Sequence, residues 1–270
     1  MRNPTIKKQR YFVQSLAKGI DLLQILAKAE EPLILSEIAT EMGTNNTTVT
    51  RLCYTLMELG IIERDRHKRY RFTPKVLTLG YAVISRLEWR GVAKYYLEQL
   101  FDEVQETVNL SIIEGAEILY IIRIRKRKYL TFDVRIGSKL PVYCTSMGKV
   151  LMAMGAPEKT QTILQTIEFR RLTSHTITSL DKFLENLDEV RIKGYAINDE
   201  ELTIGNRAIA VPILDEQGYA FAAINIAGPT THYSRKEMEK NLAPSLMRTA
   251  GEISDALKQM EVPFDKVRSL

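Results

Sequence analysis

The length, composition and charge of the chain exclude several classes of protein. With 270 residues, of which 45% are hydrophobic and 26% charged, the sequence has a globular composition and is long enough for two domains. It has no apolar run of about 18 or more residues, and its basic start lacks the apolar stretch of a secretory signal. We therefore expect a cytoplasmic protein with no membrane partner. Two cysteines, Cys53 and Cys144, are too few for a disulfide framework or a Cys-rich metal site, so we expect reduced thiols, no metal and no cofactor.

The positive charge is concentrated in the first quarter of the chain. Residues 1–75 hold 13 Lys and Arg against 8 Asp and Glu, whereas the remaining residues hold 25 of each. The net charge of +5 therefore lies in the N-terminal part. Binding to a polyanion releases counterions, so basic residues are favoured where phosphates approach. This distribution predicts an N-terminal part that binds nucleic acid, followed by a part with no net charge.

The first 75 residues have the pattern of a winged helix-turn-helix. Apolar spacing and breaker residues predict a helix at 12–29, an extended lead-in at 33–35, a helix at 37–42, a helix between 44–46 and Gly60, and a hairpin with strands at 61–64 and 70–73. Pro32 prevents the first helix from continuing. Ser36 is the predicted N-cap of the short helix, and Gly43 suits the left-handed conformation that ends it.

The helix before Gly60 carries the predicted contacts to DNA. Val49, Leu52 and Leu56 form an apolar stripe at helical spacing, which leaves a polar face outward. Asn pairs with adenine, Arg with guanine or phosphate, and the Thr methyl group with the thymine methyl group. Any surface helix has a polar face, but the short helix, the turn at Gly43 and the lack of acidic residues before Met57 favour a DNA reader. The predicted contacts are Asn45, Asn46, Thr47, Thr48, Thr50, Arg51 and Tyr54.

A basic hairpin follows this helix. Five basic residues crowd into the eight positions 64–71, where a packed ribbon with a solvated tip is the alternative to DNA contact. We favour contact with the phosphate backbone, because basic loops position a reader on DNA without reading its sequence. The predicted contacts are Arg66, Lys68 and Arg69.

The rest of the chain predicts a linker helix and an α+β domain built on an antiparallel sheet. The expected elements are helices at 75–86, 91–105, 148–154, 158–164, 181–193 and 235–260, and strands at 108–113, 118–124, 131–136, 195–198, 207–214 and 220–226. Pro244 is expected to break or kink the last helix. The charged run 123–128 contains no aromatic residue, so a solvated loop is favoured over a second nucleic-acid patch. We divide the chain into a DNA-binding domain at 1–74, a linker helix at 75–90 and an effector-binding domain at 91–270.

The segment from Pro141 to Ala153 is the second informative stretch. A turn of small and polar residues leads into a helix, and a helix N-terminus binds anions well. Thr145 and Ser146 are therefore either plain N-caps or ligand contacts. The stretch lacks the P-loop pattern, so Lys149 is not predicted to bind a nucleotide. Cys144 as a nucleophile with His175 as its base is a weak signal, because the two positions are unrelated.

These stretches, in this order, resemble the isocitrate lyase regulator (IclR) family of bacterial transcription factors. The resemblance covers about residues 11–260 and rests on YFVQSLAKGIDLLQIL, LSEIATEMGTNNTTVTRLCYTLMELGIIERD, GSKLPVYCTSMGKVLMA, GYAINDEELTIGNRAIAVPILDEQG and AFAAINIAGP. It implies a winged DNA-binding domain, a linker helix and a GAF-like effector domain, which form a homodimer or homotetramer on double-stranded DNA without catalysis. Tyr11–Leu16 and Tyr143–Leu151 are similar to the branch that controls aromatic-acid breakdown through the β-ketoadipate pathway.

The resemblance also implies an effector pocket. Its positions fall on Cys144, Thr145, Ser146, Met147, Asn198, Ala208, Asn225 and Ala227. Members that sense small acids have Asp, Cys and two Ser at the last four positions, so the departures here argue against a glyoxylate-like effector. Asn198 would repel a carboxylate less than Asp, and the two alanines would leave room for a ring. Phe132 and Val134 are predicted pocket walls, with core packing as the alternative.

We therefore expect a regulator that senses a small organic acid, either aromatic or from the β-ketoadipate pathway, and controls a nearby catabolic operon. An IclR-type regulator of another small carboxylate and a ligand-independent DNA binder are the alternatives. An enzyme that turns over a small acid is less favoured, because His67, His175 and His232 form no metal-ligand pattern and no convergent acid–base set is visible.

Overall fold

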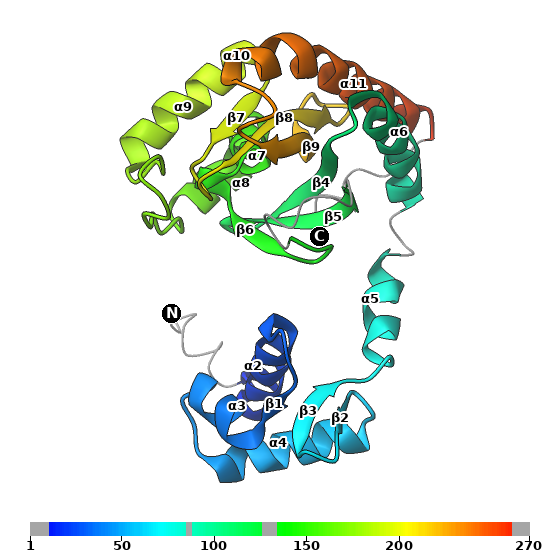
Figure 1. Cartoon of the computed structure of the whole chain (residues 1–270), viewed down its shortest axis with the longest axis vertical. Helices are drawn as coiled ribbons and strands as arrows, with labels where there is room; N and C mark the ends of the chain where they lie inside the picture. The colour runs from blue at the N-terminus through cyan, green and yellow to red at the C-terminus, as the bar shows by residue number, and fades with distance from the viewer. Residues whose placement is uncertain (1–10, 85–87, 126–133, 261–270) are drawn as a thin grey trace, which may run out of the picture. The chain divides into compact units, whose positions relative to one another are not determined.

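The structure is a computed structural model that describes residues 11–84, 88–125 and 134–260. The chain divides into two compact units, Met1–Arg86 and Leu87–Leu270, each described separately below (Figure 1). Trp89 is only 1% exposed and belongs to the core of the second unit, so that unit begins before residue 91. The division by function into 1–74, 75–90 and 91–270 stays a proposal. Within the described ranges, no helix is both long and apolar enough to span a membrane.

The first unit is a winged helix-turn-helix. Its elements are α2 (Gln14–Lys28), β1 (Leu33–Ile34), α3 (Leu35–Glu41), α4 (Asn46–Glu58), β2 (Ile62–Arg64), β3 (Arg69–Phe72) and α5 (Val76–Ile84). The strands form an antiparallel sheet in the order β1-β3-β2. Leu22 of α2, Ile38 of α3 and Val49 of α4 are fully buried against one another and hold the three helices together.

The ends of these helices follow local chemistry. The Asn45 side chain accepts a hydrogen bond from the Thr48 N–H at 2.8 Å and so caps α4. Gly43 and Gly60 have φ angles of +58° and +67°, the left-handed conformation in which glycine is unstrained. The predicted N-cap at Ser36 is wrong, because α3 begins one residue earlier at Leu35. Glu37 caps this helix instead, since its Oε2 accepts from the Ile34 N–H at 2.8 Å.

The second unit is an α+β domain on one antiparallel sheet. Its elements are α6 (Glu88–Val104), β4 (Thr107–Glu114), β5 (Glu117–Ile124), β6 (Lys139–Pro141), a 3₁₀ turn (Val142–Cys144), α7 (Ser146–Met154), α8 (Pro157–Leu164), α9 (Leu180–Lys193), β7 (Ala196–Asp199), β8 (Asn206–Leu214), β9 (Ala220–Pro229), α10 (Arg235–Glu237), a π-helical turn (Met238–Leu242) and α11 (Ala243–Gln259). The strand order is β6-β5-β4-β9-β8-β7. Two meanders, β4–β6 and β7–β9, are therefore joined edge to edge where β4 pairs with β9.

The two faces of this sheet carry different side chains. On β8, Ile209, Val211 and Ile213 belong to the core that α6 and α11 cover, as Figure 1 shows for these helices. Ala210, which lies between them, belongs with Ala223 to the core beneath α7. Alternate residues of a strand point to opposite faces, so bulky and small side chains are segregated. The small side chains let α7 pack closely on its face of the sheet.

Two predicted elements differ from the structure. Residues 131–133 lie outside the described residues, and 134–136 are not a strand; the edge strand is β6 (Lys139–Pro141). The long helix predicted at 235–260 is divided into α10, the π-helical turn and α11. The helical residues nevertheless run without a break from Arg235 to Gln259, and the irregularity expected at Pro244 is the π-helical turn just before it.

The close packing of α7 against the preceding turn can be tested at Gly148. A Cβ at residue 148 would lie 2.4 Å from both Cα and O of Val142 and 2.6 Å from Thr145 Oγ1. Gly148→Ala should lower the free energy of unfolding by about 1–3 kcal/mol, because backbone must move to admit the methyl group. Gly251→Ala in α11 is the matched control, since no atom lies within 4 Å of its added Cβ and it should gain roughly 0.5–1 kcal/mol. Equal denaturation midpoints for both variants would contradict this packing.

Candidate functional site

The outward face of α4 gathers the predicted DNA contacts on one side of the helix. Thr47, Thr50, Arg51 and Tyr54 are all exposed and follow one another at i, i+3, i+4 and i+7. Val49 is buried on the opposite side. The Tyr54 ring is 61% exposed, an unusual position for a large aromatic side chain without a partner surface. The helix therefore presents a polar stripe with one cation and one ring.

Hydrogen bonds within α4 separate capping residues from candidate readers. The side-chain oxygen Oδ1 of Asn45 already accepts from the Thr48 N–H, and Thr48 is half-buried. The Thr50 hydroxyl donates to the Asn46 carbonyl at 2.8 Å, which leaves its methyl group for outward contact. Asn46 is exposed. Asn45 and Thr48 thus begin the helix, whereas base contact by Asn46 or Arg51 fits the geometry better.

The wing is organised by Asp65. Its Oδ1 accepts from the backbone N–H groups of Arg69, at 2.9 Å, and His67, at 2.8 Å. The hydrogen bond from Arg69 holds the pKa of Asp65 below its usual value. Lys68 has a φ of 62°, which reverses the chain, and both Arg66 and Lys68 are exposed at the tip.

Arg69 has a different environment from the other basic residues of the wing. Its Nη1 donates to the Pro32 carbonyl at 2.7 Å and lies 3.8 Å from Glu37 Oε2. The guanidinium therefore ties β3 to the chain before α3. Arg69 thus has a structural role within the unit, and its predicted contact with DNA stays a prediction.

A cavity of about 70 Å³ opens in the second unit between the sheet and the start of α7. The predicted effector residues that line it are Val134, Thr145, Ser146, Asn198, Ala208, Asn225 and Ala227. Phe132 lies outside the described residues. The lining combines polar groups with small apolar ones, as expected of a pocket for a small polar ligand.

Strand register explains why residues far apart in sequence meet in this cavity. One row across the sheet pairs Asn198 with Ala208, Ala208 with Ala227, and Ala227 with Thr107. The neighbouring row pairs Asn225 with Asn109 on β4, and Asn109 with Arg123 on β5. Residues two apart on a strand share a face, so both rows line the same wall.

The second row is a hydrogen-bonded chain. Asn109 Nδ2 donates to Asn225 Oδ1 at 2.7 Å, and Arg123 Nη1 donates to Asn109 Oδ1 at 3.1 Å. Asn109 and Asn225 are 1% and 4% exposed, so their amides are fixed in the wall. Asn109 was not among the predicted site residues, and Arg123 was expected in a solvated loop. The available signal was a polar residue at alternate positions of an apolar strand, Asn109 and Ser111, facing an arginine on the next strand.

The start of α7 closes the cavity. Thr145 caps this helix: its Oγ1 accepts from the Gly148 N–H at 3.2 Å and donates to the Pro141 carbonyl at 2.9 Å. Ser146 is 1% exposed, and its buried hydroxyl has no hydrogen-bond partner among the described residues. An unsatisfied buried hydroxyl costs about 1–3 kcal/mol, so its presence in a cavity wall indicates a place for a ligand.

Two residues assigned to the pocket by resemblance lie behind its wall. Cys144 and Met147 are fully buried in the core beneath α7 and do not line the cavity. Met147 Sδ accepts from the Ser111 hydroxyl at 3.2 Å, and Cys144 Sγ lies 3.8 Å from the Pro141 carbonyl. In this structure both side chains support the wall from behind, and a direct contact of either with the effector stays a prediction.

Lys149 fixes the loop on the opposite side of the cavity. Its Nζ donates to the Ile197 carbonyl at 3.2 Å and forms a buried ion pair with Glu201. Burial lowers the pKa of Lys149 and raises that of Glu201, and each partner's charge opposes this shift. The Glu201 N–H donates to Asn198 Oδ1 at 2.9 Å. The pair thus positions Asn198, and Lys149 has a structural role.

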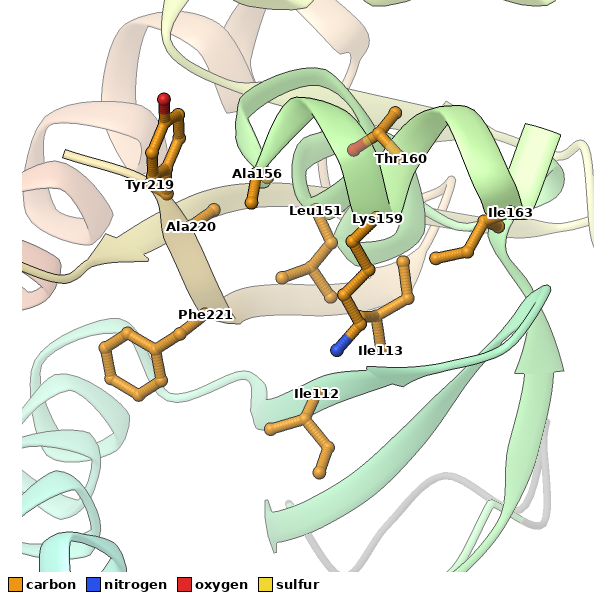
Figure 2. A pocket seen from close by; sticks show the side chains of 11 residues that line it. Ile112, Ile113, Leu151, Ala156, Lys159, Thr160, Ile163, Tyr219, Ala220 and Phe221 are labelled. Carbon is orange, nitrogen blue, oxygen red and sulfur yellow. The ribbon is translucent and has the colours of Figure 1, made fainter. Parts of the chain in front are cut away.

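A second hollow, of about 40 Å³, lies at another part of this unit (Figure 2). Figure 2 shows the side chains of Ile113, Leu151 and Lys159 close together between β4 and helices α7 and α8. Its wall is mainly aliphatic and aromatic. It lacks the convergent polar groups that orient an organic acid, so the cavity at the start of α7 is the candidate ligand site.

Comparisons with known proteins cover both units. Residues 15–66 match the IclR helix-turn-helix domain, and residues 81–255 match the bacterial transcriptional regulator IclR C-terminal domain. The Pca regulon regulatory protein of Pseudomonas putida is 32% identical over 91% of this chain and 84% of its own. The regulator KdgR of Escherichia coli (strain K12) is 31% identical over 98% of this chain and 100% of its own. The crystal structure of a transcriptional regulator from Rhodococcus sp. RHA1 is 35% identical, with a TM-score of 0.78 over 92% of this chain and 100% of that one.

The two thiols provide a test of the wall behind the cavity. Burial raises the pKa of Cys53 to about 11 and that of Cys144 to about 12. At pH 8 both should remain protonated, so 5,5′-dithiobis(2-nitrobenzoate) should label neither in the native chain and both in guanidinium chloride. Rapid labelling of the native protein that is lost in Cys144→Ser would show that Cys144 is accessible and contradict the structure.

Proposed function

Because the chain belongs to the IclR family of bacterial transcriptional regulators, we propose that its DNA-binding unit is controlled by a small organic acid bound in the cavity beside α7. The family assignment makes it a DNA-binding regulator and not an enzyme. The proposal concerns the effector, the residues that contact it, and the way binding is transmitted.

The convergence of three groups around the cavity supports an anionic ligand. The Ser146 hydroxyl and the N-terminus of α7 line the cavity on one side, and the Arg123 guanidinium lines it from the sheet. Each of these groups favours an anion: a hydroxyl and a guanidinium donate hydrogen bonds, and a helix N-terminus carries partial positive charge. A carboxylate would accept hydrogen bonds from the hydroxyl and the guanidinium and would face the helix N-terminus. This supports an acid as the effector.

The proposed effector is an aromatic acid or a β-ketoadipate-pathway metabolite, and the proposed target is a nearby catabolic operon. The similarity to a Pca regulon regulator supports this choice, and Ala208 and Ala227 leave space beside the polar wall. KdgR is nearly as similar, so identity alone does not select the effector. An acid of another class is the alternative, and the titrations below separate the two.

The DNA-binding unit is proposed to act as a homodimer or homotetramer. One recognition helix reads only a few base pairs, so two copies at a fixed spacing are needed for a promoter site. Leu77, Leu79 and Tyr81 of α5 are 72%, 63% and 70% exposed, which supports burial of this helix against a partner copy. Effector binding would shift the equilibrium between two arrangements by no more than its preference for one of them.

Arg51 should contribute directly to DNA binding. If it reads a base, Arg51→Ala should weaken binding to the operator by about 1–3 kcal/mol and relax its sequence preference; if it holds a phosphate, the salt dependence should fall by about one ion. Fluorescence anisotropy across a salt series distinguishes these results. Lys182→Ala on α9 removes the same charge from an exposed site of the other unit and should change neither. Identical curves for wild type and Arg51→Ala would exclude both roles.

Ser146 should bind the effector without stabilising the empty protein. Calorimetry with protocatechuate, 4-hydroxybenzoate and β-ketoadipate should give heat with at least one acid. Ser146→Ala should weaken that binding about 10- to 100-fold, because a hydrogen bond to a charged group is worth about 1.5–3 kcal/mol. Its unfolding temperature should not fall, since the hydroxyl has no partner in the empty cavity.

Ser111→Ala serves as the reciprocal control for this experiment. Its hydroxyl is buried outside the cavity and already donates to Met147, so this variant should lose stability and keep the effector affinity. Absence of heat and of thermal shift with all three acids would refute the aromatic-acid assignment. A DNA footprint that no acid alters would favour a ligand-independent DNA binder.

A further inference from the structure

A buried carboxylate lies in the wall of the effector cavity. Glu106, immediately before β4, is 5% exposed and lines the cavity together with Gly228 and Arg123. Among the described lining residues, Glu106 is the one acidic side chain and Arg123 the one cation. Nothing in a simple anion site calls for a carboxylate, because it would repel an acid that approached it. Its position therefore bears on which acid fits.

The Glu106 carboxylate is held in place. Its Oε1 lies 2.7 Å from His232 Nδ1. Its Oε2 would lie 3.2 Å from a Cβ at residue 228, so a glycine there leaves space for the carboxylate. An ionised carboxylate only accepts hydrogen bonds. A ligand atom that meets it must therefore be a donor.

The two charges lie at different ends of the β4 wall. Arg123 is hydrogen-bonded to Asn109, and Glu106 precedes Asn109 by three residues, roughly 10 Å along a strand at about 3.3 Å per residue. Side chains shorten the distance that a ligand has to bridge. A molecule that reaches from one end to the other needs an acceptor at Arg123 and a donor at Glu106.

We propose that the cavity selects a hydroxy monocarboxylic acid, whose carboxylate binds at Arg123 and Ser146 and whose distant hydroxyl donates to Glu106. This inference rests on the proposed function of the cavity as the effector site, and it narrows the effector class. A dicarboxylic acid of the same length would place a second carboxylate against Glu106. An acid without the hydroxyl would leave Glu106 with its His232 contact and would lose the hydrogen bond that the hydroxyl donates.

Two ligand series test the selection with the full-length chain. The aromatic series is 4-hydroxybenzoate, benzoate and terephthalate; the aliphatic series is 6-hydroxyhexanoate, hexanoate and adipate. In each series the hydroxy acid should bind at least about tenfold more tightly than the acid without the hydroxyl, and the diacid should bind weakest, as measured by calorimetry. The aliphatic series makes the result independent of whether the natural effector contains a ring.

Glu106→Gln should change the order of the ligand affinities within each series. The amide keeps the size of the side chain, removes its charge and can donate to a carboxylate, so the diacid should gain at least about tenfold in affinity while the hydroxy acid loses its advantage. Glu103→Gln is the matched control: it removes the same charge three residues away, where Glu103 bonds Ser245 and Arg248 outside the cavity. Glu103→Gln should leave the order of the ligand affinities unchanged.

The outcomes separate this inference from the proposed function. A diacid that binds wild type as tightly as the hydroxy acid of its series overturns the hydroxyl selection and leaves acid sensing intact. Lack of binding by every acid overturns the proposed function and the selection with it. Thermal unfolding shows whether Glu106→Gln is folded, and the wild-type ligand series decides the question if it is not. An unchanged ligand order in folded Glu106→Gln assigns the selection to other residues and overturns the role of Glu106.

Discussion

The pairing of β4 with β9 is the constraint on which the effector domain depends. Each meander by itself is a three-stranded ribbon, and only this seam turns the two into one sheet. It places Asn109 opposite Asn225, residues that are 116 positions apart in sequence, and aligns Thr107 with Ala227. The side-chain period of a strand is two, so a slip of one residue at the seam would turn the cavity row into the core. The apolar residues that alternate with this row, such as Val108 and Ile226, are fully buried and oppose such a slip.

The buried polar groups near the cavity differ in whether the protein itself supplies their hydrogen-bond partners. The Lys149–Glu201 pair and the Asn109–Asn225 amides are largely satisfied inside the protein, so they determine position and leave little for a ligand to gain. The Ser146 hydroxyl is the opposite case, because none of the described residues forms a hydrogen bond with it. Stability and binding are therefore assigned to neighbouring but distinct groups on α7. Lys149 anchors this helix from within, while Ser146 is its contact with the cavity.

The sequence predicted the elements well where the pattern is local. The helical stripe around Val49, the glycines after α3 and α4, and the alternation in β8 and β9 each depend on residues within a few positions. Ser36 misled the prediction because α3 already begins at Leu35, so Ser36 lies inside the helix and Glu37 accepts from the N–H of the N-cap residue Ile34. The strand expected at 131–136 was misplaced because residues 134–136 have strand-like composition but run into the turn at 136–137, whereas Lys139–Pro141 pair with β5.

The cavity was only partly predictable for a physical reason. Ser146 and Asn198 were found because short motifs carry them, but Glu106 and Arg123 become neighbours of the site only through strand register. A charged residue next to a basic run, as Arg123 is, looks like part of a loop until its strand partner is known. Cys144 and Met147 share a motif with Ser146, but their side chains lie behind the cavity wall. Neighbourhood in sequence is a poor guide to the direction in which a side chain points.

The alanines of the cavity row have a consequence for how such a sensor can change. Ala208 and Ala227 line the cavity and belong to neither hydrophobic core of the domain, whereas their strand neighbours Ile209 and Ile226 do. A larger or more polar side chain at either alanine would therefore alter the ligand space before it disturbed the packing. Ligand preference and folding are thus encoded at alternating positions of the same strands. A biosensor for a new acid could be sought by randomising the cavity row alone, and lineages could acquire new inducers through the same few codons.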